Sequence, residues 1–161
     1  MTVTKEKKVN LKFKKLNSKS VTPTKGTEYS AGLDLTAIDK KKVYNTQHGY
    51  LEYIEYSTGL AFEIPEWYVG LIFPRSSISK YNLSLSNAVG VIDSDYRGEV
   101  TFRFKGLGSA STGEYIVGDR IGQLVLMEIP RVDLIESEEL SDTVRGEGSY
   151  GSTNIQKSQA W

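Results

Sequence analysis

Short runs in which every second residue is apolar constrain the fold of this chain more than any other feature. A period of two is the signature of a β-strand with one buried and one exposed face. Glycine, proline and aspartate recur between the runs at short intervals, as they do in tight turns. The sequence therefore predicts half-buried antiparallel strands, and the runs are Leu11 and Phe13; Leu60, Phe62 and Ile64; Trp67, Val69, Leu71 and Phe73; and Val100, Phe102 and Phe104.

The remaining segments are consistent with a β-rich domain. Residues 121–129 are almost continuously apolar, which predicts a strand buried on both faces that ends before Pro130. Residues 76–81 and 136–144 could each form one helical turn, but both are shorter than the roughly 10 to 12 residues of a helix that sequence can identify. An all-β sandwich, jelly roll or barrel follows, with at most one or two short helical turns.

The charge balance and the absence of cysteine exclude several functions. The 161 residues include 20 Lys and Arg against 20 Asp and Glu, so no net charge draws the chain to nucleic acid. With no cysteine and one histidine, the chain has no thiolate nucleophile and no multi-histidine metal cage, so any metal must bind oxygen. No apolar run approaches the roughly 18 residues of a membrane span, and the N-terminus lacks a signal-peptide core. We expect a soluble, cytoplasmic protein.

Eight lysines lie before residue 26, in and around the first predicted strand. A basic arm of this kind could bind nucleic acid, but lysines on an edge strand also prevent edge-to-edge aggregation. Because the whole chain carries no net charge, the edge-strand interpretation is favoured and no nucleic-acid partner is expected.

A glycine-rich segment near the C-terminus spells G-x-G-x-x-G from Gly146 to Gly151. It neither follows a strand nor opens a helix, so it is not a dinucleotide-binding turn, and no kinase-type lysine or aspartate follows it. Arg145, Tyr150 and the hydroxyls beyond them would suit the phosphates and base of a nucleotide. A disordered tail would have the same composition.

Two further polar segments could carry chemistry. Residues 74–77, Pro-Arg-Ser-Ser, follow a predicted strand and offer a guanidinium and two hydroxyls to a phosphate. Residues 92–99 hold two carboxylates, the first of them Asp93, in a predicted hairpin between strands at 83–85 and 100–104. These carboxylates could be a general base, Mg²⁺ ligands or ordinary turn residues.

The segment around Asp93 closely resembles the third of five motifs of the trimeric dUTPase family, and the other four are present in the family's order. Each coincides with a predicted strand end or loop. The five segments are Ala-Gly-Leu-Asp-Leu-Thr-Ala at 31–37, Pro-Arg-Ser-Ser at 74–77, Asn-Ala-Val-Gly-Val-Ile-Asp-Ser-Asp-Tyr-Arg-Gly-Glu at 87–99, Gly-Asp-Arg-Ile-Gly-Gln-Leu at 118–124 and Arg-Gly-Glu-Gly-Ser-Tyr-Gly-Ser-Thr at 145–153.

The resemblance implies a jelly-roll or β-clip-like barrel that assembles as a homotrimer with shared active sites. It implies one catalytic domain at residues 1–144 and a flexible tail at 145–161 that closes over the site. The activity implied is Mg²⁺-dependent hydrolysis of dUTP to dUMP and pyrophosphate, which limits uracil incorporation into DNA and supplies dUMP. The Mg²⁺ ion would be held through the triphosphate, with no direct protein ligand.

The resemblance also assigns roles to individual positions. Asp93 would activate a water molecule for in-line attack on the α-phosphorus, Gln123 would orient water and phosphate, and Asp34 would support Arg75 and the water shell of the metal. The substrate-binding set comprises Arg75, Ser76, Ser77, Arg145, Gly151, Ser152 and Thr153 for the phosphates, Asn87, Gly90, Val91, Ile92 and Tyr150 for uracil and its pocket, and Tyr96 for the deoxyribose.

The chain departs from the family's commonest pattern at several positions, none of which carries a catalytic charge. Ser149 and Asn154 stand where glycine is usual, so we expect altered closure of the tail. The other replacements are Leu33 for an aromatic residue, Ser77 for glycine, Gly122 for alanine and Tyr150 for phenylalanine.

Three alternatives stay open at this point. A dCTP deaminase of the same superfamily shares the fold and the phosphate-binding residues but lacks the arginine-led tail. A β-barrel that binds single-stranded nucleic acid could use the ten tyrosines and the N-terminal lysines. Regulation through a protein partner, which occurs in the family, leaves no signal in these residues.

Overall fold

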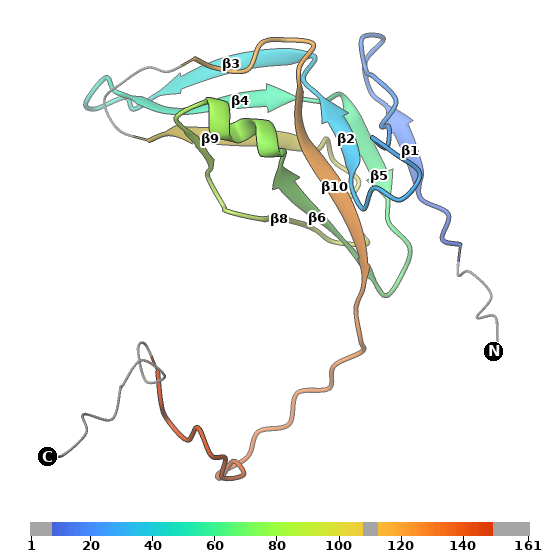
Figure 1. Cartoon of the computed structure of the whole chain (residues 1–161), viewed down its shortest axis with the longest axis vertical. Coiled ribbons are helices and arrows are strands. Elements are labelled where there is room, and N and C mark those ends of the chain that lie inside the picture. Colours follow the sequence, from blue (N-terminus) through green and yellow to red (C-terminus); the bar gives the residue numbers. More distant parts are fainter. Residues whose placement is uncertain (1–7, 108–112, 150–161) are drawn as a thin grey trace, which may run out of the picture. The chain divides into compact units, whose positions relative to one another are not determined.

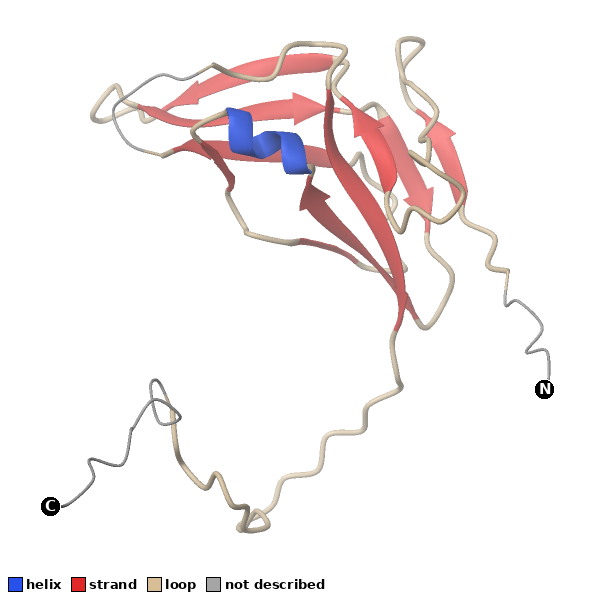
Figure 2. Ribbon diagram, in the orientation of Figure 1, coloured by secondary structure: helices blue, strands red, loops and turns tan. Residues whose placement is uncertain are grey.

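The computed structural model describes residues 8–107 and 113–149, which form ten β-strands and one short 3₁₀ helix (Figure 1). Strands make up nearly all of the regular secondary structure, as Figure 2 shows, so the all-β prediction is confirmed. The elements are β1 (Lys12–Lys15), β2 (Leu33–Thr36), β3 (Asp39–Tyr44), β4 (Leu51–Ser57), β5 (Leu60–Glu63), β6 (Tyr68–Pro74), η1 (Ser76–Lys80), β7 (Leu83–Leu85), β8 (Gly90–Ile92), β9 (Thr101–Gly106) and β10 (Arg120–Glu128).

The strands form three antiparallel sheets. The first sheet has the order β2-β10-β6-β8, the second has the order β3-β4-β9-β7, and β1 pairs with β5 in a third. Most neighbours in a sheet are distant in sequence, and the chain passes repeatedly between the two larger sheets (Figure 1). This arrangement is a jelly-roll-like barrel of short strands, as predicted.

The hydrophobic core lies between the inner faces of the two larger sheets. Leu35, Ile72 and Leu124 reach it from the first sheet, and Tyr56 and Phe102 reach it from the second. Each of these side chains is at most 3% exposed, and burying one contributes about 1.5 to 3 kcal/mol. Among the described residues, no buried side-chain nitrogen or oxygen lacks a hydrogen-bond partner.

Gly122 allows β10 to pack closely against the second sheet. A Cβ atom at this position would lie 2.1 Å from the ring of Phe102 and 2.9 Å from the carbonyl oxygen of Phe73. Phe102 is fully buried and its ring stacks on that of Phe104 at 6.1 Å, so it has no space to move aside. Glycine at position 122 is therefore matched to Phe102.

We expect Gly122→Ala to lower the free energy of unfolding by about 1 to 3 kcal/mol, because the added methyl group overpacks the core. Urea denaturation would measure the loss. Phe102→Leu should destabilise the native chain but recover part of the loss when combined with Gly122→Ala. Strictly additive effects of the two substitutions would contradict the explanation.

The strand β6 differs from the predicted one. It begins at Tyr68, because Trp67 has a left-handed backbone with a φ of 65°. Ile72 contacts the core, whereas Leu71 and Phe73 are only half-buried and point to the other side of the sheet. The expectation that the run from Trp67 to Phe73 marks the buried face is wrong for most of this strand.

The predicted burial of β10 on both faces is also wrong. Ile121 and Leu124 are buried, but Val125 is half-buried and Met127 is 48% exposed. In the sheet, Val125 lies opposite Leu71, which lies opposite Val91 of β8. The result is a continuous apolar surface on the side of the first sheet that faces away from the core. This outer apolar face comprises Leu71, Phe73, Val91, Val125 and Met127.

The first strand, β1, is exposed along its whole length instead of half-buried. Phe13 keeps 42% of its surface exposed even though its ring lies 6.5 Å from that of Phe62. Among the described strands β1 pairs with β5 alone, so its lysines lie at a sheet edge, where they oppose aggregation.

Residues 86–99 do not form the simple hairpin that was predicted. β7 does pair with β9, but β8 lies between them in sequence and pairs with β6 in the first sheet. Of the two possible helical turns, the first forms as η1, while residues 136–144, all of them described, contain no helix.

The chain divides into two compact units, Met1–Arg131 and Val132–Trp161. The described part of the second unit, up to residue 149, contains no strand or helix. The division predicted between residues 144 and 145 falls inside this unit and stays a prediction. No helix among the described residues is long and apolar enough to cross a membrane.

Candidate active site

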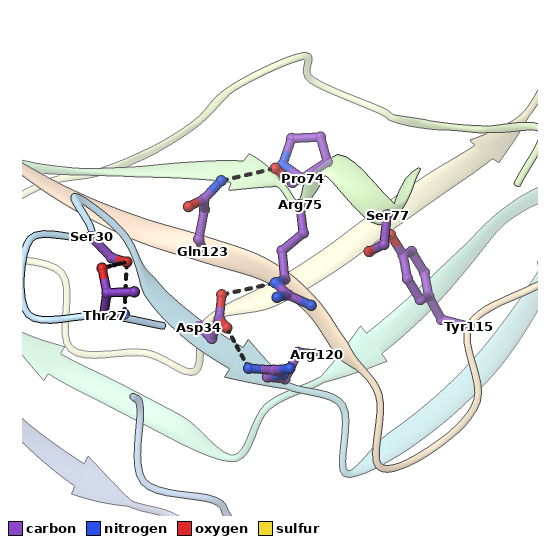
Figure 3. A network of polar contacts seen from close by, with 9 residues as sticks. All are labelled: Thr27, Ser30, Asp34, Pro74, Arg75, Ser77, Tyr115, Arg120 and Gln123. Atoms are coloured by element: carbon purple, nitrogen blue, oxygen red, sulfur yellow. Dashed lines mark hydrogen bonds and ion pairs between the residues drawn. The ribbon is translucent and has the colours of Figure 1, made fainter. Parts of the chain in front are cut away.

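Asp34 is the centre of a polar cluster where β6 ends and β10 begins (Figure 3). Its side chain is 8% exposed, and its two oxygens face different arginines. Oδ1 lies 2.9 Å from Nε of Arg75, and Oδ2 accepts a hydrogen bond from Nη1 of Arg120 at 3.0 Å. One buried carboxylate therefore holds two guanidinium groups, that of Arg120 by a charge-assisted hydrogen bond and that of Arg75 by an ion pair.

The register of three strands places this cluster. Asp34 of β2 lies opposite Gln123 of β10, which in turn lies opposite Phe73 of β6. Because side chains alternate along a strand, these three residues lie on the side of the sheet opposite to Leu35 and Leu124, which are in the core. The cluster thus adjoins the outer apolar face.

Gln123 is held beside the arginines by two contacts. Its Nε2 donates a hydrogen bond to the carbonyl oxygen of Pro74 at 3.3 Å. Gly32 packs so closely that a Cβ atom there would lie 2.2 Å from Oε1 of Gln123. The amide is therefore oriented at the edge of the cluster, where it can bind a phosphate or a water molecule.

The helix η1 begins directly after Arg75, and its first two residues are serines. Ser76 is exposed and Ser77 is half-buried. Arg75 itself has an extended backbone, with φ of −82° and ψ of 160°, so the chain turns sharply between the guanidinium and the first serine. A guanidinium and an exposed hydroxyl on adjacent residues can both donate hydrogen bonds to one phosphate group.

Tyr115 supports η1 from inside the barrel. It is 2% exposed, its ring lies 4.5 Å from that of Tyr81, and its hydroxyl lies 3.5 Å from Oγ of Ser77. Its carbonyl oxygen accepts hydrogen bonds from Oη of Tyr56 at 3.0 Å and Nζ of Lys40 at 3.1 Å. Burial raises the pKa of Tyr115, so the hydroxyl stays protonated at neutral pH.

The segment that carries Tyr115 is held by an ion-pair triad. Glu114 contacts Lys40 and also Lys42, the latter at 2.8 Å. Burial opposes ionisation of Glu114, but hydrogen bonds from the two lysines outweigh it and lower the pKa of the carboxyl. The hydrogen bond to Glu114 likewise raises the pKa of Lys42. The triad is therefore charged at neutral pH.

A cavity of about 350 Å³ lies between β7, β8 and β9. It adjoins Ala88, whose φ of 58° is a left-handed conformation that few residues other than glycine adopt. Such strain persists only where the surroundings fix it, and it often marks a ligand site. The walls comprise Asn87, Gly90, Val91 and Ile92, all predicted to bind substrate, together with Ile72, Leu85, Ser86, Thr101 and Arg103.

A second cavity of about 260 Å³ shares Val91 and Ile92 with the first and includes Asp93 and Tyr96. The carboxylate of Asp93 is exposed. Tyr96 is fixed at both ends, because its N–H donates to the carbonyl of Asp93 at 3.2 Å and its hydroxyl donates to the carbonyl of Glu99 at 3.1 Å. Residues predicted to bind uracil, sugar and attacking water therefore lie side by side.

Within one chain, Asp93 lies far from the Asp34 cluster. Ile92, immediately before Asp93, is opposite Gly70, whereas Arg75 follows Gly70 by five residues along and just beyond β6. At about 3.3 Å per residue, this offset corresponds to roughly 16 Å. The predicted phosphate-binding and water-activating residues thus form two half-sites.

The sequence of the chain matches the dUTPase family model over residues 18–154. The chain belongs to the dUTPase family. It is 37% identical over 150 residues to the deoxyuridine 5'-triphosphate nucleotidohydrolase of Hydrogenobaculum, an alignment that covers 91% of this chain and 99% of that protein.

Solved structures of the family share the fold. The dUTPase of Staphylococcus bacteriophage 80alpha with dUpNHpp has a TM-score of 0.72 at 26% identity, covering 89% of this chain and 97% of that one. A mutant dUTPase of phage phi11 of S. aureus, described for its coordination of a structural Mg(II) ion, has a TM-score of 0.67 at 25% identity, covering 81% and 98%.

The tail residues predicted to reach the substrate are only partly described. Arg145 is exposed, and its Nε donates to the carbonyl oxygen of Gly148 at 3.0 Å, within a turn where Gly146 has a φ of 51°. This arginine is thus bonded to its own loop. Four predicted substrate-binding residues lie outside the described residues: Tyr150, Gly151, Ser152 and Thr153.

Two residues of the site were missed by the sequence analysis. Arg120 shares Asp34 with Arg75, and its presence in the fourth motif beside the predicted turn at Asp119 was the available signal. Tyr115 lies outside all five motifs, and nothing in the sequence links it to Ser77, which is 38 residues away.

The donors present fit a metal ion that is held by the substrate. No group of three or more acidic or histidine side chains among the described residues is placed to hold a metal ion. Both oxygens of Asp34 are already paired with arginines, so this carboxylate is suited to contact a metal-bound water molecule and not the ion itself.

Proposed function

We propose that this member of the dUTPase family hydrolyses dUTP to dUMP and pyrophosphate. The observation that carries the proposal is the cluster in which the buried Asp34 orients Arg75 beside Gln123. The substrate named for the Hydrogenobaculum relative and the dUTP analogue bound by the phage enzyme support the choice of nucleotide.

The phosphates would bind at the Asp34 cluster. Arg75 presents its remaining guanidinium N–H groups, because Nε is occupied by Asp34. Ser76 adds an exposed hydroxyl, and Ser77 contributes mainly through its contact with Tyr115. Gln123 would orient a phosphate oxygen or the attacking water molecule from the other side.

Uracil would enter the cavity bounded by Asn87 and Gly90. Asn87 carries both a donor and an acceptor, which matches the alternating edge of uracil. A Cβ atom at Gly90 would lie 3.0 Å from Ile72, which shows how little space this wall leaves. A pocket this narrow would exclude the methyl group of thymine, while Tyr96 would pack under the deoxyribose and exclude a 2'-hydroxyl.

Asp93 would act as the general base. Its carboxylate takes a proton from a water molecule as the water oxygen attacks the α-phosphorus in line. The bond from the α-phosphorus to the oxygen that bridges it to the β-phosphorus breaks, and pyrophosphate leaves with that electron pair. Because a carboxylate is a weak base, most of the acceleration would come from positioning and from cations around the phosphates.

Bound Mg²⁺ would neutralise phosphate charge and order the triphosphate, held by the phosphate oxygens and, through water, by Asp34. The structural Mg(II) ion of the phage phi11 enzyme supports the choice of this ion.

The assembly we propose is a homotrimer with active sites between copies. Two features of the single chain support an assembly: the roughly 16 Å between the half-sites and the uncovered outer apolar face next to the phosphate cluster. Packing this face against other copies would remove an apolar patch from water and bring Asp93 of one chain near Arg75 of another. The number of copies follows from the family resemblance.

The C-terminal tail would complete the site. We propose that residues 145–161 form a segment distinct from a catalytic domain at 1–144, with Arg145 binding the γ-phosphate and Tyr150 stacking on uracil. Arg145 would exchange its bond to Gly148 for the phosphate, since a charged partner is the stronger acceptor.

Incubation of the purified chain and Mg²⁺ with dUTP, dCTP, dTTP or UTP, followed by mass spectrometry, tests the proposal. We expect dUMP and pyrophosphate from dUTP alone. Formation of dUTP from dCTP would instead identify a deaminase. The absence of any product, combined with salt-dependent binding of oligonucleotides, would favour a non-catalytic binding module.

A further inference from the structure

The loop at residues 93–99 is closed by hydrogen bonds among its own residues. The hydroxyl of Tyr96 donates to the carbonyl oxygen of Glu99 at 3.1 Å. Nη1 of Arg97 donates to the carbonyl oxygen of Ser94 at 2.7 Å. Bonds of this kind keep the loop compact, but they do not fix where the loop lies relative to the rest of the barrel.

The ring of Tyr96 moves with the end of this loop. It packs directly on Gly98, where a Cβ atom would lie 2.3 Å from the hydroxyl oxygen of Tyr96 and 2.9 Å from Cε2 of its ring. The hydroxyl is in turn bonded to the backbone of Glu99. Whatever fixes Glu99 therefore also fixes the ring that we place under the deoxyribose.

The side chain of Glu99 ties the loop to the barrel. Its Oε1 accepts a hydrogen bond from the N–H of Gly59 at 2.7 Å. Gly59 is buried in the turn between β4 and β5, so its N–H would be costly to leave without an acceptor. A carboxylate is a strong acceptor for such a group, because the bond is charge-assisted. The link between loop and barrel is therefore a short bond to a buried backbone group.

The turn at Gly59 is a rigid support for this bond. Oγ1 of Thr58, which is fully buried, donates to the carbonyl oxygen of Val100 at 2.6 Å, and the N–H of Val100 donates to the carbonyl oxygen of Leu60 at 2.8 Å. Gly59 has a φ of 65°, and a Cβ atom there would lie 2.6 Å from Cδ1 of Ile38. The turn has no space to shift, so it can hold the carboxylate in one place.

We propose that Glu99 is a positioning residue for Tyr96 and thereby sets the preference for deoxyribose over ribose. Glu99 lines the same cavity as Asp93 and Tyr96. The proposal rests on the proposed function, in which Tyr96 packs under the sugar. Without the carboxylate the loop samples positions in which the ring is withdrawn, and these positions leave space for a 2'-hydroxyl. Binding of dUTP then weakens, because fewer molecules have the ring in place.

Backbone order parameters from NMR relaxation test the anchor without any assay of activity. For residues 93–97 of the native chain we expect about 0.85, the value of a rigid backbone, and in Glu99→Ala less than about 0.7. Glu99→Gln keeps an accepting oxygen at the same place and should stay within about 0.05 of the native values. Equal order parameters in all three proteins, or a native loop that is already mobile, would overturn the proposal.

Inhibition by UTP tests the consequence for specificity. The ratio of the inhibition constant of UTP to the KM for dUTP should fall about fivefold in Glu99→Ala and change less than about twofold in Glu99→Gln. A lower Tm with a native ratio would show a purely structural role and overturn the proposal, as would a Glu99→Ala protein that UTP does not inhibit. If the native chain does not hydrolyse dUTP, the proposed function fails, while the order parameters still decide whether Glu99 holds the loop.

Discussion

Asp93→Asn should lower kcat for dUTP about a thousandfold while leaving affinity for the nucleotide within a few-fold. The amide keeps the shape of the side chain but cannot accept the proton of the attacking water. Asp93 is exposed, so the fold should not respond. Steady-state kinetics would give kcat, and calorimetric titration with dUpNHpp and Mg²⁺ would give the affinity.

Asp95 provides a matched control two residues along the same loop. It is also exposed, but it lies outside the cavity that contains Asp93 and Tyr96. We expect Asp95→Asn to change kcat by no more than about threefold, because its charge acts on the site only through solvent. Retention of the native kcat by Asp93→Asn would refute the proposed role of this carboxylate.

Mixing inactive variants would show whether one site draws on two chains. Asp93→Asn and Arg75→Ala should each be inactive alone. If Asp93 acts with Arg75 of another copy, equal amounts of the two variants that are unfolded and refolded together should regain about a quarter of the native activity. The reason is that each of the two residues at a site then has about an even chance of being intact. Mixed assemblies that stay inactive would place both residues in one chain's site.

The second large effect is expected at Asp34. Asp34→Asn removes the charge that holds Arg75 and Arg120 and turns an N–H donor toward one of them. Breaking a fully buried pair costs about 3 to 5 kcal/mol, and because the side chain of Arg120 is 51% exposed we expect a smaller loss of about 2 kcal/mol. Urea denaturation would measure it, and kcat/KM for dUTP should fall about a hundredfold as Arg75 loses its orientation.

The ion pair of Lys12 with Glu63 is the control for this experiment. Its distance of 2.7 Å is shorter than either contact of Asp34, but its side chains are 75% and 50% exposed. We expect Glu63→Gln to change stability by less than about 0.5 kcal/mol, because water screens the pair. If both substitutions cost the same, burial of Asp34 would not explain its effect.

Local patterns predicted the fold class because most strands alternate over their own length. These local patterns failed where the structure of a segment depends on residues outside that segment. Trp67 is apolar, as the alternation requires, but the turn before the strand gives its backbone a left-handed φ. Met127 belongs to an apolar run, yet one face of β10 is uncovered in a single chain. β8 has three residues, too few to show a period, and its partner β6 is a distant segment.

Only the site residues that lie within short sequence motifs could be predicted. The family resemblance paired Asp34 with Arg75, and in the structure Nε of Arg75 lies 2.9 Å from Oδ1 of Asp34. The fourth motif contains Arg120, but the pairing of Arg120 with Asp34 could not be inferred, because the two residues are 86 positions apart in sequence. Tyr115 shows the same limit, since its support of η1 depends on how a loop folds into the barrel.

The distance between Asp93 and Arg75 has a consequence for how activity varies with protein concentration. A chain whose half-sites are about 16 Å apart has no working site of its own under the proposed assembly. Specific activity should therefore fall on dilution below the dissociation constant of the assembly. A newly synthesised chain would not hydrolyse cellular nucleotides until it had assembled with other copies.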